Sequence, residues 1–150
     1  MTSKSNVPAV TKFSRSIAVT YCDDVRLEMH NKMSFVGIYQ SQMLVREFPA
    51  RVLRLCVCVQ PMLPKTLRFE SAQIGVYRDD ELLAQSDFAP PDEAWTSETL
   101  GYVGGVTSFI FETLELTSST TFRVRMSFDD GEVIGGATLA VQEAGSTHDI

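Results

Sequence analysis

The sequence predicts an all-β protein, an antiparallel β-sandwich of eight or nine strands that forms one domain over residues 1–150. Apolar and polar residues alternate with a period of two along most of the chain, whereas helical periodicity is scarce. Turn-forming residues separate the alternating segments at the short spacing that is typical of a sandwich. A length of 150 residues, with 44% hydrophobic and 21% charged residues, is that of an ordinary globular domain.

The alternating segments predict the strands in order. We expect strands at 15–22, 33–39, 42–46, 52–60, 67–78, 81–86, 107–116, 121–128 and 132–141. Three of these strands have a clear apolar face, formed by Leu53, Leu55, Val57 and Val59, by Phe122, Val124, Met126 and Phe128, and by Val133, Ala137, Leu139 and Val141. Such alternation is typical of an antiparallel strand with one face on the core.

Turn-forming residues mark the connections between these strands. Asp130-Gly131 lies between the last two strands, where glycine accepts the positive φ of a tight turn. Asp79-Asp80 is expected to form another turn because Asp is favoured there. The segments 1–12 and 143–150 have no alternation, so we expect them to be flexible tails.

The net charge of −6 is distributed unevenly. Residues 1–78 contain 11 Lys and Arg against 5 Asp and Glu, a balance of +6, and residues 79–150 contain 2 against 14, a balance of −12. This asymmetry could steer a protein partner or support self-association. Nucleic acid is not expected as a partner of the acidic half, because phosphate contacts need clustered Lys and Arg.

The three cysteines, Cys22, Cys56 and Cys58, are expected to be free and buried in an intracellular protein. Cys56 and Cys58 lie two residues apart in a predicted strand, where a disulfide would need unfavourable geometry. No apolar run approaches the roughly 20 residues that span a bilayer. The first residues lack the apolar core of a signal peptide. We therefore expect a cytoplasmic protein with no membrane contact.

The stretch YCDDVRLEMHNKMSFVGIY, residues 21–39, contains the densest group of ligand-like side chains. A metal site would be sought among Cys22, Asp23, Asp24, His30, Cys56 and Cys58. Structural zinc needs two pairs of ligands at a spacing that this chain lacks. The favoured interpretation is a structural corner formed by Cys22, Asp23, Asp24 and Arg26, in which a strand ends at Cys22, the carboxylates bond backbone amides and Arg26 pairs with one of them.

Two further kinds of site are weaker alternatives. Calcium could bind loop carboxylates, since Asp-Asp pairs occur at 23/24, 79/80 and 129/130, but simple alternation of the strands places the third pair at the opposite end from the others. A reactive Cys22 could use His30 as its base, yet the spacing does not require them to meet. We therefore predict no catalytic residue, no metal and no cofactor.

The loop SDFAPPDEAWTSETLGYVGG, residues 86–105, is the strongest candidate for recognition. It is long, acidic and aromatic, and long loops with aromatic residues are often binding elements. Its candidate partner-binding residues are Phe88, Asp92, Glu93, Trp95 and Tyr102. Pro91 followed by two acids also suits the first turn of a short helix, in which case Trp95 would pack over the mouth of the sandwich.

The signature Cys22-Asp23-Asp24, Arg26, Lys32 and Gly37-Ile38-Tyr39, with the Phe48-Pro49 step, resembles an uncharacterised family of small bacterial and prophage proteins. The late hairpin TFRVRMSFDDGEVIGGATLAV is similar to that family as well, so the resemblance covers residues 16–141. It implies an immunoglobulin-like (Greek-key) sandwich in a bacterial or phage setting, and it implies no activity. Met29-His30-Asn31 departs from the family, where small turn residues are expected.

These observations predict a non-enzymatic β-sandwich that works by protein–protein contact. With the resemblance, they suggest a phage- or prophage-encoded protein in a bacterial cytoplasm or associated with the virion. It would be an accessory component of a particle or a modulator of a host protein. The alternative is a β-sandwich that binds a small ligand or calcium.

Overall fold

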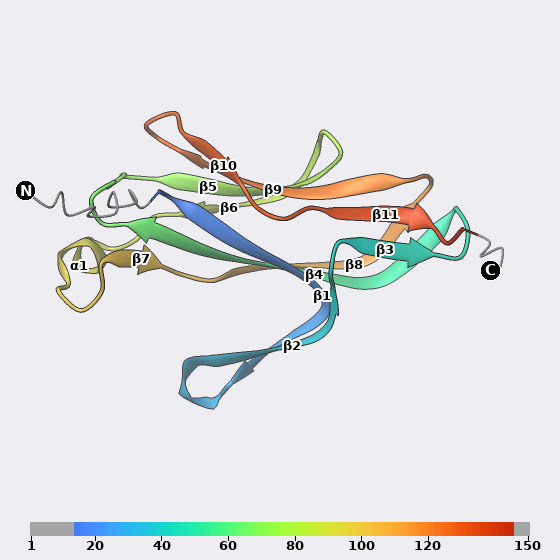
Figure 1. Ribbon diagram of the computed structural model, residues 1–150, viewed down its shortest axis with the longest axis horizontal. Coiled ribbons are helices and arrows are strands. Elements are labelled where there is room, and N and C mark those ends of the chain that lie inside the picture. Colours follow the sequence, from blue (N-terminus) through green and yellow to red (C-terminus); the bar gives the residue numbers. More distant parts are fainter. Residues whose placement is uncertain (1–13, 146–150) are drawn as a thin grey trace, which may run out of the picture.

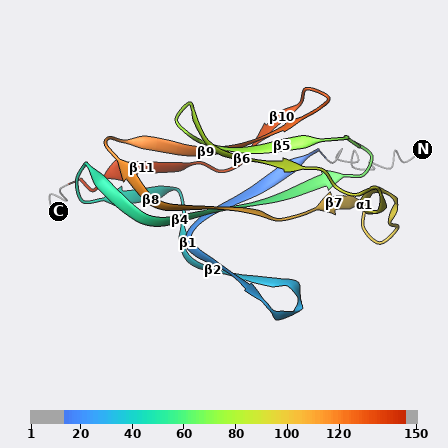
Figure 2. The same ribbon diagram turned by 180° about the vertical axis from the view of Figure 1, so that it is seen from behind.

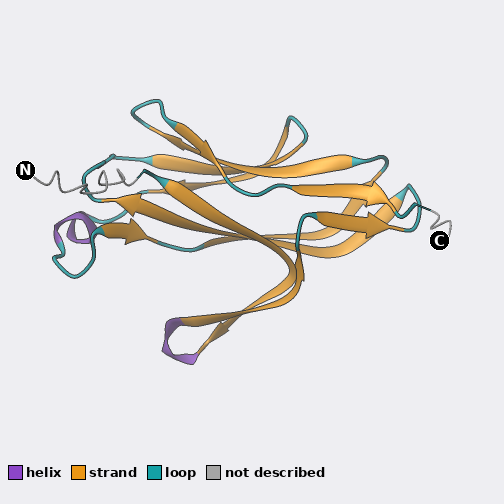
Figure 3. Ribbon diagram, in the orientation of Figure 1, coloured by secondary structure: helices purple, strands orange, loops and turns teal. Residues whose placement is uncertain are grey.

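Two β-sheets pack face to face around one apolar core (Figure 1). The computed structural model describes residues 14–145. Almost all of the predicted flexible tails, 1–12 and 143–150, therefore lies outside the described residues. Strands make up most of the described chain, and the helical segments are two short turns (Figure 3). The predicted all-β sandwich is confirmed, but the described residues form eleven strands where eight or nine were expected.

The first sheet contains five strands and the second contains six in the described part of the chain. The first consists of β1 (Ser16–Glu28), β2 (Lys32–Tyr39), β4 (Ala50–Pro64), β7 (Tyr102–Gly104) and β8 (Thr107–Leu116). The second consists of β3 (Gln42–Val45), β5 (Ala72–Arg78), β6 (Glu81–Phe88), β9 (Thr120–Phe128), β10 (Val133–Gly135) and β11 (Leu139–Glu143). The pairing is antiparallel except between β3 and β11, which run parallel.

The predicted apolar face of β9 is confirmed, because Phe122, Val124, Met126 and Phe128 are all buried. In β4 the prediction holds for Leu55, Val57 and Val59 and is wrong for Leu53, whose side chain is 74% exposed. Leu53 lies opposite Thr113. This is the one position between Ala50 and Val59 at which the β4–β8 pairing is interrupted. Thr113 has a φ of 59°, in the left-handed region, so β8 is irregular opposite Leu53.

Several strand ends differ from the expectation. The predicted strand 67–78 begins only at Ala72, although Phe69 is buried ahead of it. The predicted strand 132–141 is divided into β10 and β11, so its expected common face is wrong: Val133 and Ala137 are exposed, whereas Leu139 and Val141 are in the core. The largest difference concerns β1, which continues beyond Cys22 to Glu28.

Candidate functional site

A two-stranded ribbon projects from the sandwich (Figures 1 and 2). From Ser16 to Cys22, β1 pairs with β4. Beyond Cys22, β1 pairs only with β2, from Asp24 opposite Val36 to Glu28 opposite Lys32. Residues 24–36 are named the ribbon here. An isolated two-stranded ribbon is only marginally stable in water, so this element lacks the packing that stabilises the other strands.

One face of the ribbon is apolar. Val25 lies opposite Phe35 and Leu27 lies opposite Met33, and directly opposed residues share a face of the sheet. Val25, Phe35 and Met33 are partly buried, while Leu27 is 83% exposed. Met29, in the turn, is 77% exposed. No other described segment covers these two side chains.

The opposite face of the ribbon is mostly charged. Arg26 Nε lies 3.4 Å from Asp24 Oδ2, so the expected pairing of Arg26 with one of the two aspartates is present. The Ser34 hydroxyl donates to Glu28 Oε1 over 2.9 Å. The ribbon is therefore amphipathic, and its apolar face is exposed to solvent toward the tip, at Leu27 and Met29.

The chain turns at the 3-10 segment η1 (Met29–Asn31), and not at the aspartates. His30 and Asn31 have φ values of 61° and 58°, in the left-handed region that Asn and His tolerate better than most residues. The predicted corner at Cys22 to Asp24 is thus wrong as a strand end. Those residues form the base of the ribbon.

Asp23 and Asp24 anchor that base. The Tyr39 hydroxyl donates to Asp23 Oδ1 over 3.0 Å, and Asp24 Oδ1 accepts from the Val25 amide over 3.0 Å. Arg54 Nη2 lies 3.1 Å from Asp24 Oδ1, which ties the ribbon to β4. Gly37 has a φ of 66°, and a Cβ there would collide with the Asp23 carboxylate, so glycine allows Asp23 to lie against β2.

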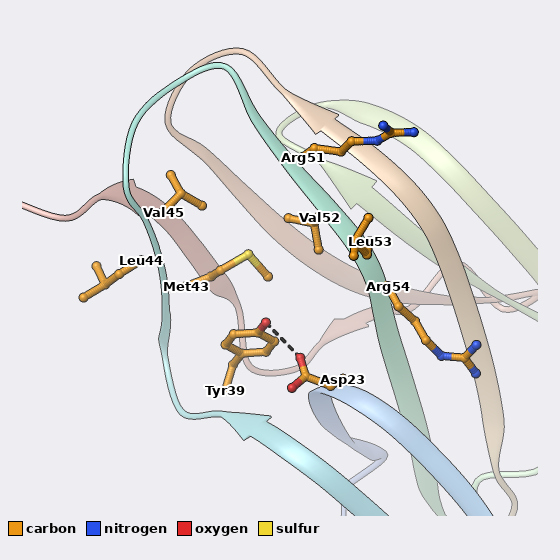
Figure 4. A pocket seen from close by; sticks show the side chains of 9 residues that line it. All are labelled: Asp23, Tyr39, Met43, Leu44, Val45, Arg51, Val52, Leu53 and Arg54. Carbon is orange, nitrogen blue, oxygen red and sulfur yellow. Dashed lines mark hydrogen bonds between the residues drawn. The ribbon is translucent and has the colours of Figure 1, made fainter.

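A groove of about 470 Å³ lies beside this base (Figure 4). It is lined by Asp23, Tyr39, Met43, Leu44, Val45, Arg51, Val52, Leu53 and Arg54. Met43 and Val52 point toward its centre, and Leu44 points away. Leu53 is exposed on one side, and Arg51 is exposed near it. The groove therefore combines apolar side chains with charged residues of both signs, the carboxylate of Asp23 and the side chains of Arg51 and Arg54. The sequence did not reveal it, because Leu53 was predicted to be inside.

The three cysteines are free and fully buried. Cys22 lies directly opposite Cys56 on β4. Burial raises the pKa of Cys22 to about 11, with the neighbouring thiols Cys56 and Cys58 adding to the shift. Burial also raises the pKa of Cys58. The thiols of Cys22 and Cys58 are therefore protonated and poorly nucleophilic at neutral pH.

The residues considered for metal or acid–base chemistry do not converge. His30 is in the turn of the ribbon, eight residues along from Cys22 at its base, so the structure does not bring this pair together. Within residues 14–145 there is no group of three or more His, Cys, Asp or Glu side chains that could hold a metal ion. Asp79 contacts the start of β9 and Asp129 the segment before β5, at opposite ends of the second sheet.

The acidic loop contains the helix α1 (Asp92–Thr96), as the alternative interpretation predicted. Trp95 is 8% exposed and packs edge-on against Phe69, with ring centroids 5.0 Å apart. Arg68 Nη2 lies 2.7 Å from Asp92 Oδ1 and its guanidinium is 5.8 Å from the centre of the Trp95 ring. Burial favours a packing role for Trp95 over direct partner contact.

The other residues of the loop are spread over its surface. Asp92 and Glu93 are exposed, Tyr102 is 40% exposed and Phe88 is partly buried. Their role in partner binding stays a prediction. Sequence reasoning missed the ribbon, whose only signal was the run of apolar residues on both sides of the Met29-His30-Asn31 turn.

No protein-family model matches the chain, and no curated protein matches it in sequence. The resemblance to a bacterial and prophage family therefore stays a prediction. Among residues 14–145, no helix is long and apolar enough to cross a membrane.

Proposed function

We propose that this protein is a non-enzymatic binding domain that inserts its ribbon into an apolar cleft of a protein partner. The exposure of Leu27 and Met29 at the end of the ribbon carries the proposal. Burying such a side chain stabilises a complex by roughly 1.5–3 kcal/mol. A cytoplasmic or virion setting in a phage-infected bacterium, with an immunoglobulin-like sandwich as scaffold, is the part of the proposal that rests on the sequence resemblance.

The sandwich supports this role mechanically. Its core positions the base of the ribbon through Tyr21, which is buried, and through the Asp24–Arg54 contact. The tip is thus presented away from the domain, where a partner can surround it (Figure 1). A virion protein would supply the cleft if this protein is an accessory component of a particle. A host protein would supply it if this protein is a modulator.

A photo-crosslinker placed at position 27 tests the proposal. The protein carrying p-benzoylphenylalanine in place of Leu27 should form a covalent adduct with another protein chain in bacterial cells. The matched control is the same substitution at Val133, which is 57% exposed on β10 of the other sheet. Equal adduct yields at the two positions, or none at position 27, would overturn the proposal.

A second variant separates binding from folding. Replacement of Leu27 and Met29 by serine should leave the melting temperature unchanged, because both side chains are exposed. It should nevertheless abolish the complex that the crosslinker identifies. The control replaces two exposed apolar residues of the second sheet, Leu82 and Val133, by serine and should retain the complex.

A further inference from the structure

We propose that the cleft that receives the ribbon is the groove beside the ribbon base of a second copy of this chain. This inference rests on the proposed function and names its partner. The contact is heterologous, since the ribbon of one copy and the groove of the next are different surfaces. Each copy then offers one free ribbon and one free groove, so the assembly continues as a ring or a filament.

The groove has the size and chemistry that the ribbon tip needs. Its volume of about 470 Å³ lies within the range of roughly 300–1,000 Å³ that is typical of sites that take a ligand. Val52 and Leu53 offer apolar surface, and Leu53 is 74% exposed. Leu27 and Met29 of the incoming tip would cover this surface. Contact would bury exposed apolar area on both copies.

Charge complementarity supports the same pairing. Arg51 lines the groove, is exposed and forms no ion pair with another residue of the range 14–145. Glu28 lies between Leu27 and Met29, accepts a hydrogen bond from the Ser34 hydroxyl and lies opposite Lys32, but it forms no ion pair within residues 14–145. End-on entry of the tip brings both faces of the ribbon into the groove, and Glu28 then meets Arg51 of the second copy.

The ribbon cannot fill the groove of its own chain. The groove begins at Tyr39, the last residue of β2. The tip lies at the other end of β2, and the eight residues of that strand span about 23 Å at roughly 3.3 Å per residue. The ribbon also points away from β3 and β4 where they form the groove (Figure 1). Only another molecule can bring the two surfaces together.

Complementation between two association-defective variants tests the inference. Leu27→Asp removes the ribbon contact and Leu53→Asp removes the groove contact, and both sites are exposed, so each variant should fold as the unmodified protein does. Sedimentation velocity should show concentration-dependent assembly beyond a dimer for the unmodified protein. Each variant alone should be monomeric, with association weakened by roughly tenfold or more from the lost apolar contact.

An equimolar mixture of the two variants is the decisive sample. It retains one intact ribbon and one intact groove, so it should form a complex of two chains and nothing larger. A monomeric mixture would refute the inference, as would persistent association of the Leu53→Asp variant, which indicates that two ribbons pack on each other. Charge reversal adds a check: Glu28→Arg should weaken assembly, and adding Arg51→Glu to the same chain should restore it.

The inference and the proposed function can fail separately. If the unmodified protein stays monomeric while the crosslinker at position 27 joins it to a different protein, the second copy is excluded and the binding role of the ribbon stands. If position 27 forms no adduct at all, both are refuted. An adduct of two copies of this chain supports both.

Discussion

The hydroxyl of Tyr21 joins the two sheets near the base of the ribbon. The buried Tyr21 hydroxyl donates to the Ala137 carbonyl over 2.8 Å, with the Phe122 carbonyl as a second acceptor at 3.3 Å. Desolvation raises the pKa of Tyr21 well above its usual value, so the hydroxyl keeps its proton and stays a donor at neutral pH. This contact connects β1 to the second sheet.

Tyr21→Phe is therefore expected to lower the free energy of unfolding by about 1–2 kcal/mol, because the variant removes the hydroxyl that bonds the Ala137 and Phe122 carbonyls across the two sheets. Urea denaturation measures the difference. Tyr39→Phe is the matched control, since that hydroxyl bonds the exposed Asp23 carboxylate and its loss should cost less. A larger loss for Tyr39→Phe would contradict this assignment.

Individual carboxylates also make stability depend on pH. Asp79 accepts from the Thr120 hydroxyl over 2.7 Å and from the Thr121 amide over 3.0 Å, and these two bonds lower its pKa. Asp130 has a lowered pKa because it accepts from the Glu132 amide and pairs with Arg15. Both groups are more acidic in the folded than in the unfolded protein.

Their contribution is fully present above the unfolded pKa of about 3.9 and is lost as the pH falls through the folded value. Asp79→Asn should therefore reduce the drop in melting temperature between neutral pH and pH of about 3. Thermal unfolding across this range measures the slope. Asp80→Asn, on the exposed neighbour, serves as the control, and an equal change in both variants would disprove the role of Asp79.

At the scale of the element, the short helix α1 depends on its tertiary contacts. Five residues are too few for a stable isolated helix, so Trp95 and its contact with Phe69 hold α1 at the mouth of the sandwich. Trp95→Ala should destabilise the protein by roughly 3 kcal/mol, the usual cost of emptying a large aromatic site. Chemical denaturation measures this loss.

Tyr102→Ala is the comparison for that variant, because Tyr102 comes from the same loop and is 40% exposed. Its effect on stability should be small. If Trp95→Ala instead leaves stability unchanged and abolishes a complex, Trp95 contacts a partner and its packing role is wrong.

The ribbon and the helix show why elements were only partly predictable. Alternation predicted strands at 15–22 and 33–39, but the pattern of alternation is the same whether the apolar face of a strand meets a core or solvent. Which face is covered depends on strands far away in the sequence, so the projection of the ribbon could not be inferred. The helix was accessible because its signal, Pro91 followed by two acids, is local.

At the scale of the whole molecule, the acidic residues are dispersed. Asp79 is bonded to β9, whereas Asp129 accepts from the Glu70 and Ser71 amides and Asp130 pairs with Arg15. The carboxylates are thus already engaged and belong to separate ends of the fold. Calcium needs six to eight oxygens around one point.

Millimolar calcium is therefore expected to leave the melting temperature unchanged, since a ligand stabilises a protein only in proportion to its binding to the native state. Differential scanning calorimetry with calcium and with a chelator measures the shift, and magnesium controls for ionic strength. A clear rise with calcium alone would support the alternative of a calcium-binding sandwich.

The sequence by itself determined the all-β class, the core faces of β9 and most of β4, the hairpin at Asp130-Gly131 and the short helix after Pro91. These depend on periodicity and turn chemistry, which act over a few residues. The tertiary structure alone decided that Leu53 is outside, that Trp95 is inside and that the ribbon leaves the sheet at Asp23. Each of those outcomes depends on whether a segment far away in the sequence covers a side chain. Local alternation carries no information about such coverage.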